Sequence, residues 1–254
     1  MRPFPLAPLL CAALLGGAAH GAPVRILVED AASPWSNHAG EGYANDLVRA
    51  AFAAAGAAAD LVVVPYARCK ALVMQGGAPA CFSMSAAPEL ERVVRFADKP
   101  LFSVTPRFYF NARQPLAARS VAELAAGTRV GIVHGYEYPP FVAGLAQRGI
   151  VLESARSDVA NLQKLAAGRL DTALVMTDDM RSEELIQRQA GVAAVGFAFA
   201  TAPMGSYIGF STRHPDGEAQ RRLFNQGFQA ISANGTRQAI EAKWKRRCAR
   251  VCPE

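Results

Sequence analysis

Short apolar runs of β-forming residues alternate with segments of helical periodicity along most of this chain. In the first part, strand-like runs at 24–28, 61–64 and 80–84 are separated by helical patterns at 43–55 and 68–75. Both helical patterns end at a glycine, which is a common helix stop signal. Strands separated by helices form parallel sheets with the helices packed on their faces, so we predict an α/β fold.

The same alternation starts again after an extended segment at 107–110. Strand-like runs and helical patterns follow at 129–133, 140–148, 161–167, 171–175 and 179–189, and then a strand and two helices at 207–210, 218–232 and 236–246. A chain of 254 residues has room for two lobes of about 100 residues each. We therefore predict one lobe from residues 23–110 and 205–254, and a second, inserted lobe from residues 111–204.

The N-terminus has the three parts of a secretory signal peptide. Arg2 supplies a positive charge, residues 6–15 form an apolar run interrupted only by a proline, and small residues follow at 16–22. The run is too short to span a membrane, and no later segment reaches the about 18 apolar residues that a span needs. Cys11 follows two leucines, where a lipoprotein signal has small residues. We therefore predict that residues 1–22 are a signal peptide and that the mature protein is soluble in the periplasm.

Four cysteines remain after the predicted cleavage: Cys69, Cys81, Cys248 and Cys252. An even number of cysteines fits disulfides in an oxidising compartment. Three pairings are open, and the simplest joins Cys69 to Cys81 and Cys248 to Cys252, because each pair closes a short loop. Structural zinc sites usually place their cysteines in tight CxxC pairs, which this spacing does not provide. We expect neither a metal nor a cofactor.

The positive charge of the chain is concentrated near its C-terminus. The formal net charge is +6 and the isoelectric point is near 9.3. Much of the excess lies at 244–250, and the sequence has no basic stripe interleaved with aromatic residues of the kind that binds nucleic acid. We expect a solvated basic tail and no nucleic-acid partner.

Five segments that span most of the mature chain share the features of one protein family. They are Gly42-Tyr43-Ala44-Asn45-Asp46-Leu47, Val64-Pro65-Tyr66, Ser120-Val121-Ala122-Glu123-Leu124, Leu165 to Leu174, and Asn234-Gly235-Thr236 with the later Trp244. In their order and spacing they resemble the family 3 extracellular solute-binding proteins, which are the periplasmic partners of amino-acid and related ABC importers.

The resemblance implies a two-lobe, type II-like periplasmic binding protein fold with two hinge crossings, near 108–113 and 202–210. It also implies a small-molecule ligand held between the lobes and an inner-membrane ABC permease as partner. We expect a monomer that binds a small polar molecule and is not an enzyme.

The residues that hold amino acids in this family are altered here. By the resemblance, the arginine that binds the α-carboxylate is replaced by Leu90, the acid that binds the α-ammonium by Met176, and the threonine of the second-lobe loop by Tyr136. A plain α-amino acid is therefore not the ligand that we expect first. A small shift would still let Asp178 or Arg92 replace an anchor.

Eight residues are candidates for a rebuilt pocket at the carboxyl ends of the strands, where open α/β sheets bind ligands. They offer aromatic walls, hydroxyl donors, a guanidinium for an acidic group and carboxylates for a cationic one. The set is Glu29, Trp35, Tyr66, Arg68, Ser83, Ser85, Tyr136 and Asp178. We interpret the neighbouring Glu137 as a solvated side chain, and the same interpretation stays open for Arg68.

Two alternatives to transport stay open. An accessory or sensor protein would use the same ligand pocket but signal to a membrane partner. A dehydratase-like enzyme on the same fold would need a cleft acid or base with a shifted pKa, for which Glu29, His134, Glu137 and Asp178 are the candidates. The chain has no nucleophile elbow, HExxH or P-loop motif.

Overall fold

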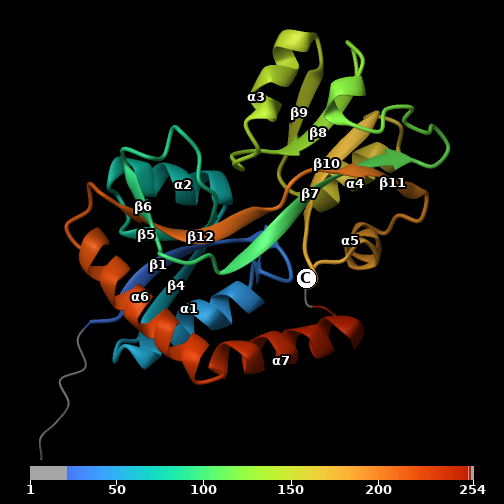
Figure 1. The fold of residues 1–254 in the computed structure, drawn as a ribbon. Coiled ribbons are helices and arrows are strands. Elements are labelled where there is room, and N and C mark those ends of the chain that lie inside the picture. The colour runs from blue at the N-terminus through green and yellow to red at the C-terminus, as the bar shows by residue number, and fades with distance from the viewer. Residues whose placement is uncertain (1–21, 251, 253–254) are drawn as a thin grey trace, which may run out of the picture.

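The computed structural model describes residues 22–250 and 252, so residues 1–21 of the predicted signal peptide lie outside the described part. The chain forms two α/β lobes, which are joined by long strands that pass between them (Figure 1). None of the helices within the described residues is long and apolar enough to cross a membrane.

Lobe I contains both ends of the described chain. Its strands run in the order β4-β1-β5-β12, with β6 paired to β12; β1 is parallel to β4 and β5, and β12 is antiparallel to β5. The elements are β1 (Val24–Glu29), α1 (Tyr43–Ala54), β4 (Ala59–Val64), α2 (Tyr66–Gln75), β5 (Ala80–Met84), β6 (Val94–Phe96), β12 (Met204–Ser211), α6 (Gly217–Ala233) and α7 (Thr236–Arg250). A short hairpin of β2 (Ala31–Ala32) and β3 (Ser36–Asn37) follows β1.

Helices α1 and α6 pack closely on each other in lobe I. The Phe52 ring of α1 lies 5.6 Å from the Phe224 ring of α6, and both side chains are fully buried. At Gly227 a Cβ atom would lie only 1.8 Å from the carbonyl oxygen of Ala51. A glycine on α6 therefore permits the two helix backbones to approach.

Lobe II is a second α/β unit, and its sheet includes the C-terminal part of β7. Parallel strands β8 and β9 and the antiparallel pairs of β7 with β10 and β11 form its sheet. Its elements are β7 (Phe102–Asn111), β8 (Arg129–Val133), α3 (Phe141–Leu145), β9 (Val151–Ala155), α4 (Asp158–Ala166), β10 (Thr172–Thr177), α5 (Glu183–Ala190) and β11 (Val195–Ala200), with 3₁₀ turns at Val121–Glu123 and Ala146–Arg148. Ser157 and Ser182 cap α4 and α5, as serine commonly does at helix starts.

Strands β7 and β12 make the two crossings between the lobes. They pair antiparallel from Phe102 to Val104, and from Thr105 onward β7 pairs with β10 of lobe II. The change of partner therefore comes before the predicted limit at 110/111. The precise residue limits of the lobes stay a prediction.

Both pairs of cysteines are joined by disulfides. Cys69 of α2 is bonded to Cys81 of β5, and Cys248 of α7 is bonded to Cys252. Both cysteines of the first disulfide are fully buried, and the bond holds α2 against β5.

Candidate functional site

The candidate site is a small cavity between the lobes, at the carboxyl ends of β1 and β5. Its volume is about 20 Å³, which is room for about one water molecule. The lining residues come from both lobes: Glu29, Trp35, Ser83, Ser85, Phe102, Val104, Tyr136, Glu137, Met176 and Ser206. Five of the eight predicted site residues line it, and Tyr66 and Asp178 each contact a lining residue. Ser83 and Ser85 lie where β5 ends, as predicted.

Glu29 ends β1 and is 1% exposed. One carboxylate oxygen, Oε2, accepts a hydrogen bond of 3.0 Å from the Tyr136 hydroxyl, and Oε1 has no hydrogen-bond partner. Burial raises the pKa of the Glu29 carboxyl to about 7, although the nearby Ser83 and Tyr136 hydroxyls and the positive charge of Arg181 lower it. Glu29 has no ion-pair partner among the residues that the structure describes.

Glu137 is buried at 6% exposure, so its interpretation as a solvated side chain is wrong. Its Oε2 atom accepts hydrogen bonds from the Tyr66 hydroxyl at 2.6 Å and from the Ser85 backbone N–H at 2.9 Å. Its Oε1 atom lies 2.8 Å from the Lys70 ammonium. All three donors belong to lobe I and Glu137 belongs to lobe II, which no local sequence pattern reveals.

A second group of contacts joins the lobes at Trp35. The indole N–H donates to Oδ2 of Asp178 at 2.8 Å, and the ring stacks on Phe102 with centroids 4.9 Å apart. The guanidinium of Arg181 lies 4.9 Å from the centre of the same ring, within cation–π range. Trp35 therefore contacts lobe II through two polar partners.

Arg181 forms a buried ion pair with Asp158, the first residue of α4. Both side chains are almost fully enclosed, and Arg181 also donates to the Met176 carbonyl at 3.1 Å. Burial raises the pKa of the Asp158 carboxyl, against the lowering effect of the Arg181 charge. Neither residue was among the predicted site residues, and only their contact in the folded chain, between positions 23 apart, identifies them.

Of the remaining predicted residues, Ser83 and Ser85 lie at the cavity and Arg68 does not. The Ser85 hydroxyl donates to the Gly205 carbonyl at 2.9 Å, while Ser83 has a positive φ of 65° and its hydroxyl has no partner in hydrogen-bond geometry, although it is close enough to act on Glu29. Arg68 is exposed and does not line the cavity. Lys70, two residues further along α2, supplies the positive charge that was expected from Arg68.

Leu90 and Met176, two of the three altered family positions, lie in different surroundings. Leu90 is fully buried in a hydrophobic cluster of lobe I, while Met176 is 3% exposed and lines the cavity. His134, a candidate acid or base for an enzyme, is exposed.

Gly135 permits the close approach of the lobe II loop to α2. A Cβ atom here would lie 2.9 Å from the Cβ atom of Ala67, and φ is +87°. We predict that Gly135→Ala keeps the lobes from closing fully and increases the radius of gyration in small-angle X-ray scattering. Gly127→Ala is the matched control, because φ is +85° there but no atom lies within 4 Å of the added Cβ. Each change should lower the free energy of unfolding by about 1 kcal/mol, because alanine disfavours a positive φ. Equal scattering from both variants would contradict the contact between Gly135 and Ala67.

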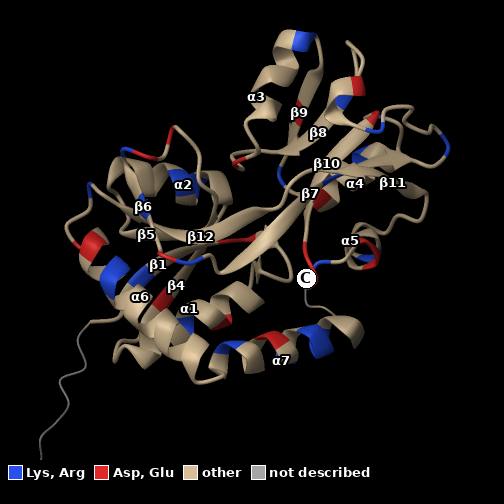
Figure 2. Cartoon of the chain, in the orientation of Figure 1, with Lys and Arg blue, Asp and Glu red and all other residues tan. Residues whose placement is uncertain are grey.

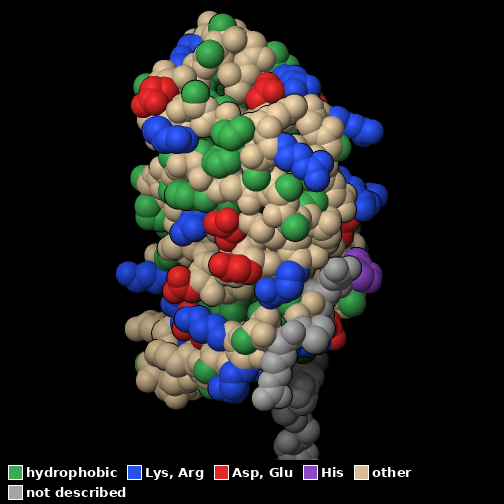
Figure 3. Space-filling view, turned by 90° about the vertical axis from the view of Figure 1, so that its right-hand side faces the viewer, with side chains coloured by type: hydrophobic (Ala, Val, Ile, Leu, Met, Phe, Trp, Pro, Cys, Tyr) green, Lys and Arg blue, Asp and Glu red, His purple; other side chains and the backbone are tan. Residues whose placement is uncertain are grey.

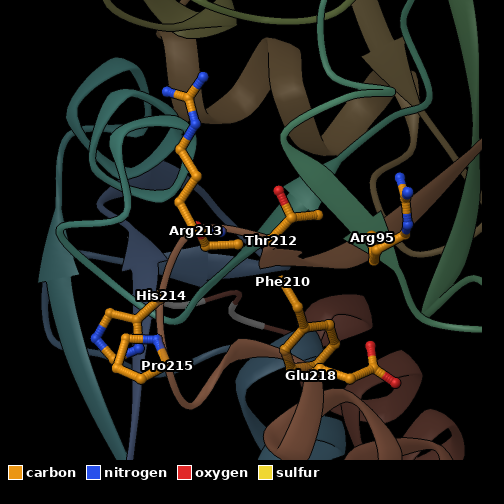
Figure 4. A pocket seen from close by; sticks show the side chains of 8 residues that line it. Arg95, Phe210, Thr212, Arg213, His214, Pro215 and Glu218 are labelled. Atoms are coloured by element: carbon orange, nitrogen blue, oxygen red, sulfur yellow. The ribbon is translucent and has the colours of Figure 1, made fainter.

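A larger hollow lies on lobe I beside β12 and α6, with a volume of about 500 Å³ (Figure 4). Its two arginines are already engaged, since Arg95 donates to the Glu91 carbonyl and Arg213 to the Met74 carbonyl. Their guanidinium groups do not converge on one point in Figure 4. This hollow therefore lacks the convergent polar groups of the interlobe site.

Charged residues are spread over both lobes (Figure 2), and basic and acidic side chains are mixed on the face drawn in Figure 3. That face presents no large area of one sign, which a nucleic-acid surface would need. Within the described residues no three His, Cys, Asp or Glu side chains are grouped to hold a metal ion.

Comparison with known proteins identifies the family. Residues 24–247 match the bacterial extracellular solute-binding proteins, family 3. The chain belongs to this family. Its members are extracellular and bind solutes, so this solute-binding protein is a ligand-binding protein that works outside the cytoplasm. No curated protein matches the sequence.

Three solved structures share the fold at low sequence identity. A histidine kinase sensor domain with similarity to periplasmic binding proteins has a TM-score of 0.76 and 19% identity, over 89% of this chain and 96% of that chain. An ancestral arginine-binding protein bound to arginine has a TM-score of 0.73 and 18% identity, over 87% of this chain and 97% of that chain. The ancestral amino acid-binding protein AncCDT-1, a precursor of cyclohexadienyl dehydratase, has a TM-score of 0.69 and 14% identity, over 87% of this chain and 94% of that chain. At these identities the likeness confirms the predicted two-lobe fold alone.

Proposed function

We propose that this solute-binding protein captures a small molecule with a cationic group between its lobes, in the periplasm, and delivers it to an ABC importer of the inner membrane. The observation that carries the proposal is Glu29, a buried carboxyl that lines the interlobe cavity and has no basic side chain in ion-pair contact in the described chain. The other carboxyl groups around the cleft have partners: Glu137 has Lys70, Asp158 has Arg181, and Asp178 has backbone N–H groups and Trp35.

Aromatic side chains around Glu29 support the same ligand class. The Tyr66 and Tyr136 rings meet edge to face at 5.1 Å, and Trp35 of lobe I lines the same cavity. Aromatic faces attract cations, and a cation beside Glu29 would stabilise the ionised carboxylate. Because the ligand would contact both lobes, its binding would favour the closed form.

A thermal-shift screen of the purified protein tests the proposal. We expect diamines, guanidines or basic amino acids to raise the unfolding midpoint, because a ligand at 100 times its dissociation constant adds about 2.7 kcal/mol. The Glu29→Gln variant should lose most of the shift, since it keeps the shape of the side chain but removes its charge. A wild-type shift with dicarboxylates or neutral sugars, and with no cation, would contradict the ligand class.

A sensor role is the second candidate, supported by the fold similarity to the histidine kinase sensor domain. Both roles share the ligand site and differ in the membrane partner. Uptake of the identified ligand by cells with and without the protein separates them: lost uptake supports the importer role, and unchanged uptake supports the sensor role. Burial raises the pKa of the Glu29 and Asp178 carboxyls, as an enzyme on this fold would need. Catalysis still has weaker support, because His134 is exposed and Glu137 and Asp178 are held in contacts between the lobes.

A further inference from the structure

Three hydrogen-bond donors of lobe I converge on one point beside the cavity. They are the backbone N–H of Ser85, the hydroxyl of Tyr66 and the ammonium of Lys70. Burial raises the pKa of the Tyr66 phenol well above its ordinary value, so this hydroxyl donates. A backbone N–H, a hydroxyl and an ammonium together form a binding position for a carboxylate.

The carboxylate that occupies this position belongs to the protein itself. Glu137 extends from the loop after β8 of lobe II, and its side chain is 1% exposed. Its Oε2 atom accepts hydrogen bonds from the Tyr66 hydroxyl at 2.6 Å and the Ser85 N–H at 2.9 Å, and its Oε1 atom forms an ion pair with the Lys70 ammonium at 2.8 Å. The cavity that remains beside it has about 20 Å³, so any ligand needs the lobes to open further. While Glu137 stays on the three donors, a second carboxylate finds no free donors at this position.

We propose that Glu137 determines ligand specificity by acting as a built-in carboxylate, so that the cleft accepts cations that lack a carboxylate, such as diamines and guanidino-amines. This inference rests on the proposed function, because it narrows the ligand class of the same site. Glu137 fills the anion position from lobe II, and Glu29 is left to bind the cationic group.

The competition between Glu137 and a ligand carboxylate is unequal. Glu137 is tethered to the same chain, so its effective concentration at the three donors is in the millimolar range or above. A ligand with its own carboxylate must displace Glu137, and the two negative groups then repel each other in a closed cleft. A cation without a carboxylate meets neither obstacle.

The first experiment uses acetate and needs no knowledge of the ligand. Glu137→Ala removes the internal carboxylate and leaves the three donors in place. We expect sodium acetate to raise the unfolding midpoint of this variant by about 2–4 °C relative to sodium chloride at equal ionic strength. The wild-type protein and Glu153→Ala should show no difference between the salts, because Glu153 is a lobe II carboxylate paired with Lys164 away from the site.

The outcome of the acetate experiment is decisive in either direction. If acetate stabilises Glu137→Ala no more than it stabilises the wild-type protein, the three donors do not form a carboxylate position and the inference is wrong. The Glu137→Ser variant covers the case in which Glu137→Ala does not fold, because it also empties the position and should gain the same response to acetate. Glu137→Gln is the filled control: it keeps the side-chain shape and should lose stability without becoming sensitive to acetate.

The second experiment compares ligands that differ by one carboxylate. Agmatine is arginine without its carboxylate, and cadaverine is lysine without its carboxylate. We expect wild-type protein to bind agmatine or cadaverine at least about tenfold more tightly than the matching amino acid in calorimetry. In Glu137→Ala this preference should fall by about tenfold or reverse. Equal binding of both members by the wild-type protein would overturn the inference.

The two proposals fail in different ways. If none of the four cations binds to the wild-type protein or to Glu137→Ala, the proposed function is wrong, and the acetate experiment alone then decides whether Glu137 fills a carboxylate position. If arginine or lysine binds better than its decarboxylated partner, the proposed cationic ligand class is supported and the inference about Glu137 is wrong.

Discussion

Arg181→Met should lower the free energy of unfolding by about 3–5 kcal/mol, the range for removing one partner of a buried ion pair. Methionine fills much of the space of the arginine stem, so the loss is mainly electrostatic. Asp158 would remain enclosed with no cation beside it, and Trp35 would lose the guanidinium at 4.9 Å from its ring. Urea denaturation, followed by the shift of the midpoint at constant slope, measures the change.

The double variant Arg181→Met/Asp158→Leu separates the ion pair from general packing damage. Replacing both partners by apolar residues removes the unpaired charge, so most of the lost stability should return. Arg221→Met is the control, because Arg221 pairs with Glu218 and Asp98 at the surface and should cost less than about 1 kcal/mol. A loss at Arg181 no larger than the loss at Arg221 would contradict the stabilising role of the buried pair.

The alternation of strands and helices was sufficient to predict the layered fold. The expected strand at 80–84 and helix at 43–55 coincide with β5 and α1 within one residue. Strands β9 and β11 were missed. Strand β9, Val-Leu-Glu-Ser-Ala, lacks the continuous apolar run of a buried parallel strand. Strand β11 is apolar throughout and was not recognised as a strand; it pairs antiparallel with β7, and its Phe197 is 44% exposed. The helix expected at 140–148 is divided into α3 and a 3₁₀ turn.

The site was predictable only where strand ends determine it. Glu29 and Ser83 lie near the carboxyl ends of buried strands and Ser85 directly follows one, and the strand ends of a parallel sheet meet at one edge. The partners across the cleft depend on how the lobes close, because Tyr66 and Glu137 are 71 positions apart and Trp35 and Asp178 are 143 apart. A glutamate in a loop is usually solvated, and nothing in its neighbours along the chain, Tyr136 and Tyr138, distinguishes Glu137 from that ordinary case.

Stability of the ligand-free protein should fall by about 3 kcal/mol between pH 4.5 and pH 7 through Glu29 alone. The pKa of this carboxyl rises from 4.5 to about 7 on folding because the side chain is buried. Between these values the folded protein binds more protons than the unfolded chain, so raising the pH favours unfolding. Burial also raises the pKa of Asp158 and Asp178, which adds to the same trend. Thermal denaturation across this range should show a shallower fall in Glu29→Gln.

Affinity for a cationic ligand should change in the opposite direction over the same pH range. The ligand binds to the ionised form of Glu29, and the ionised fraction falls tenfold for each pH unit below the pKa of about 7. Calorimetry with agmatine should therefore show binding that strengthens by about 100-fold from pH 5 to pH 8 in the wild-type protein and stays nearly constant in Glu29→Gln. A cation that binds equally well at both pH values would mean that it does not contact Glu29. Stability that falls with pH while affinity rises is the combination that a buried carboxyl held for a cation requires, because ionisation is unfavourable in the empty cleft and favourable once the cation is bound.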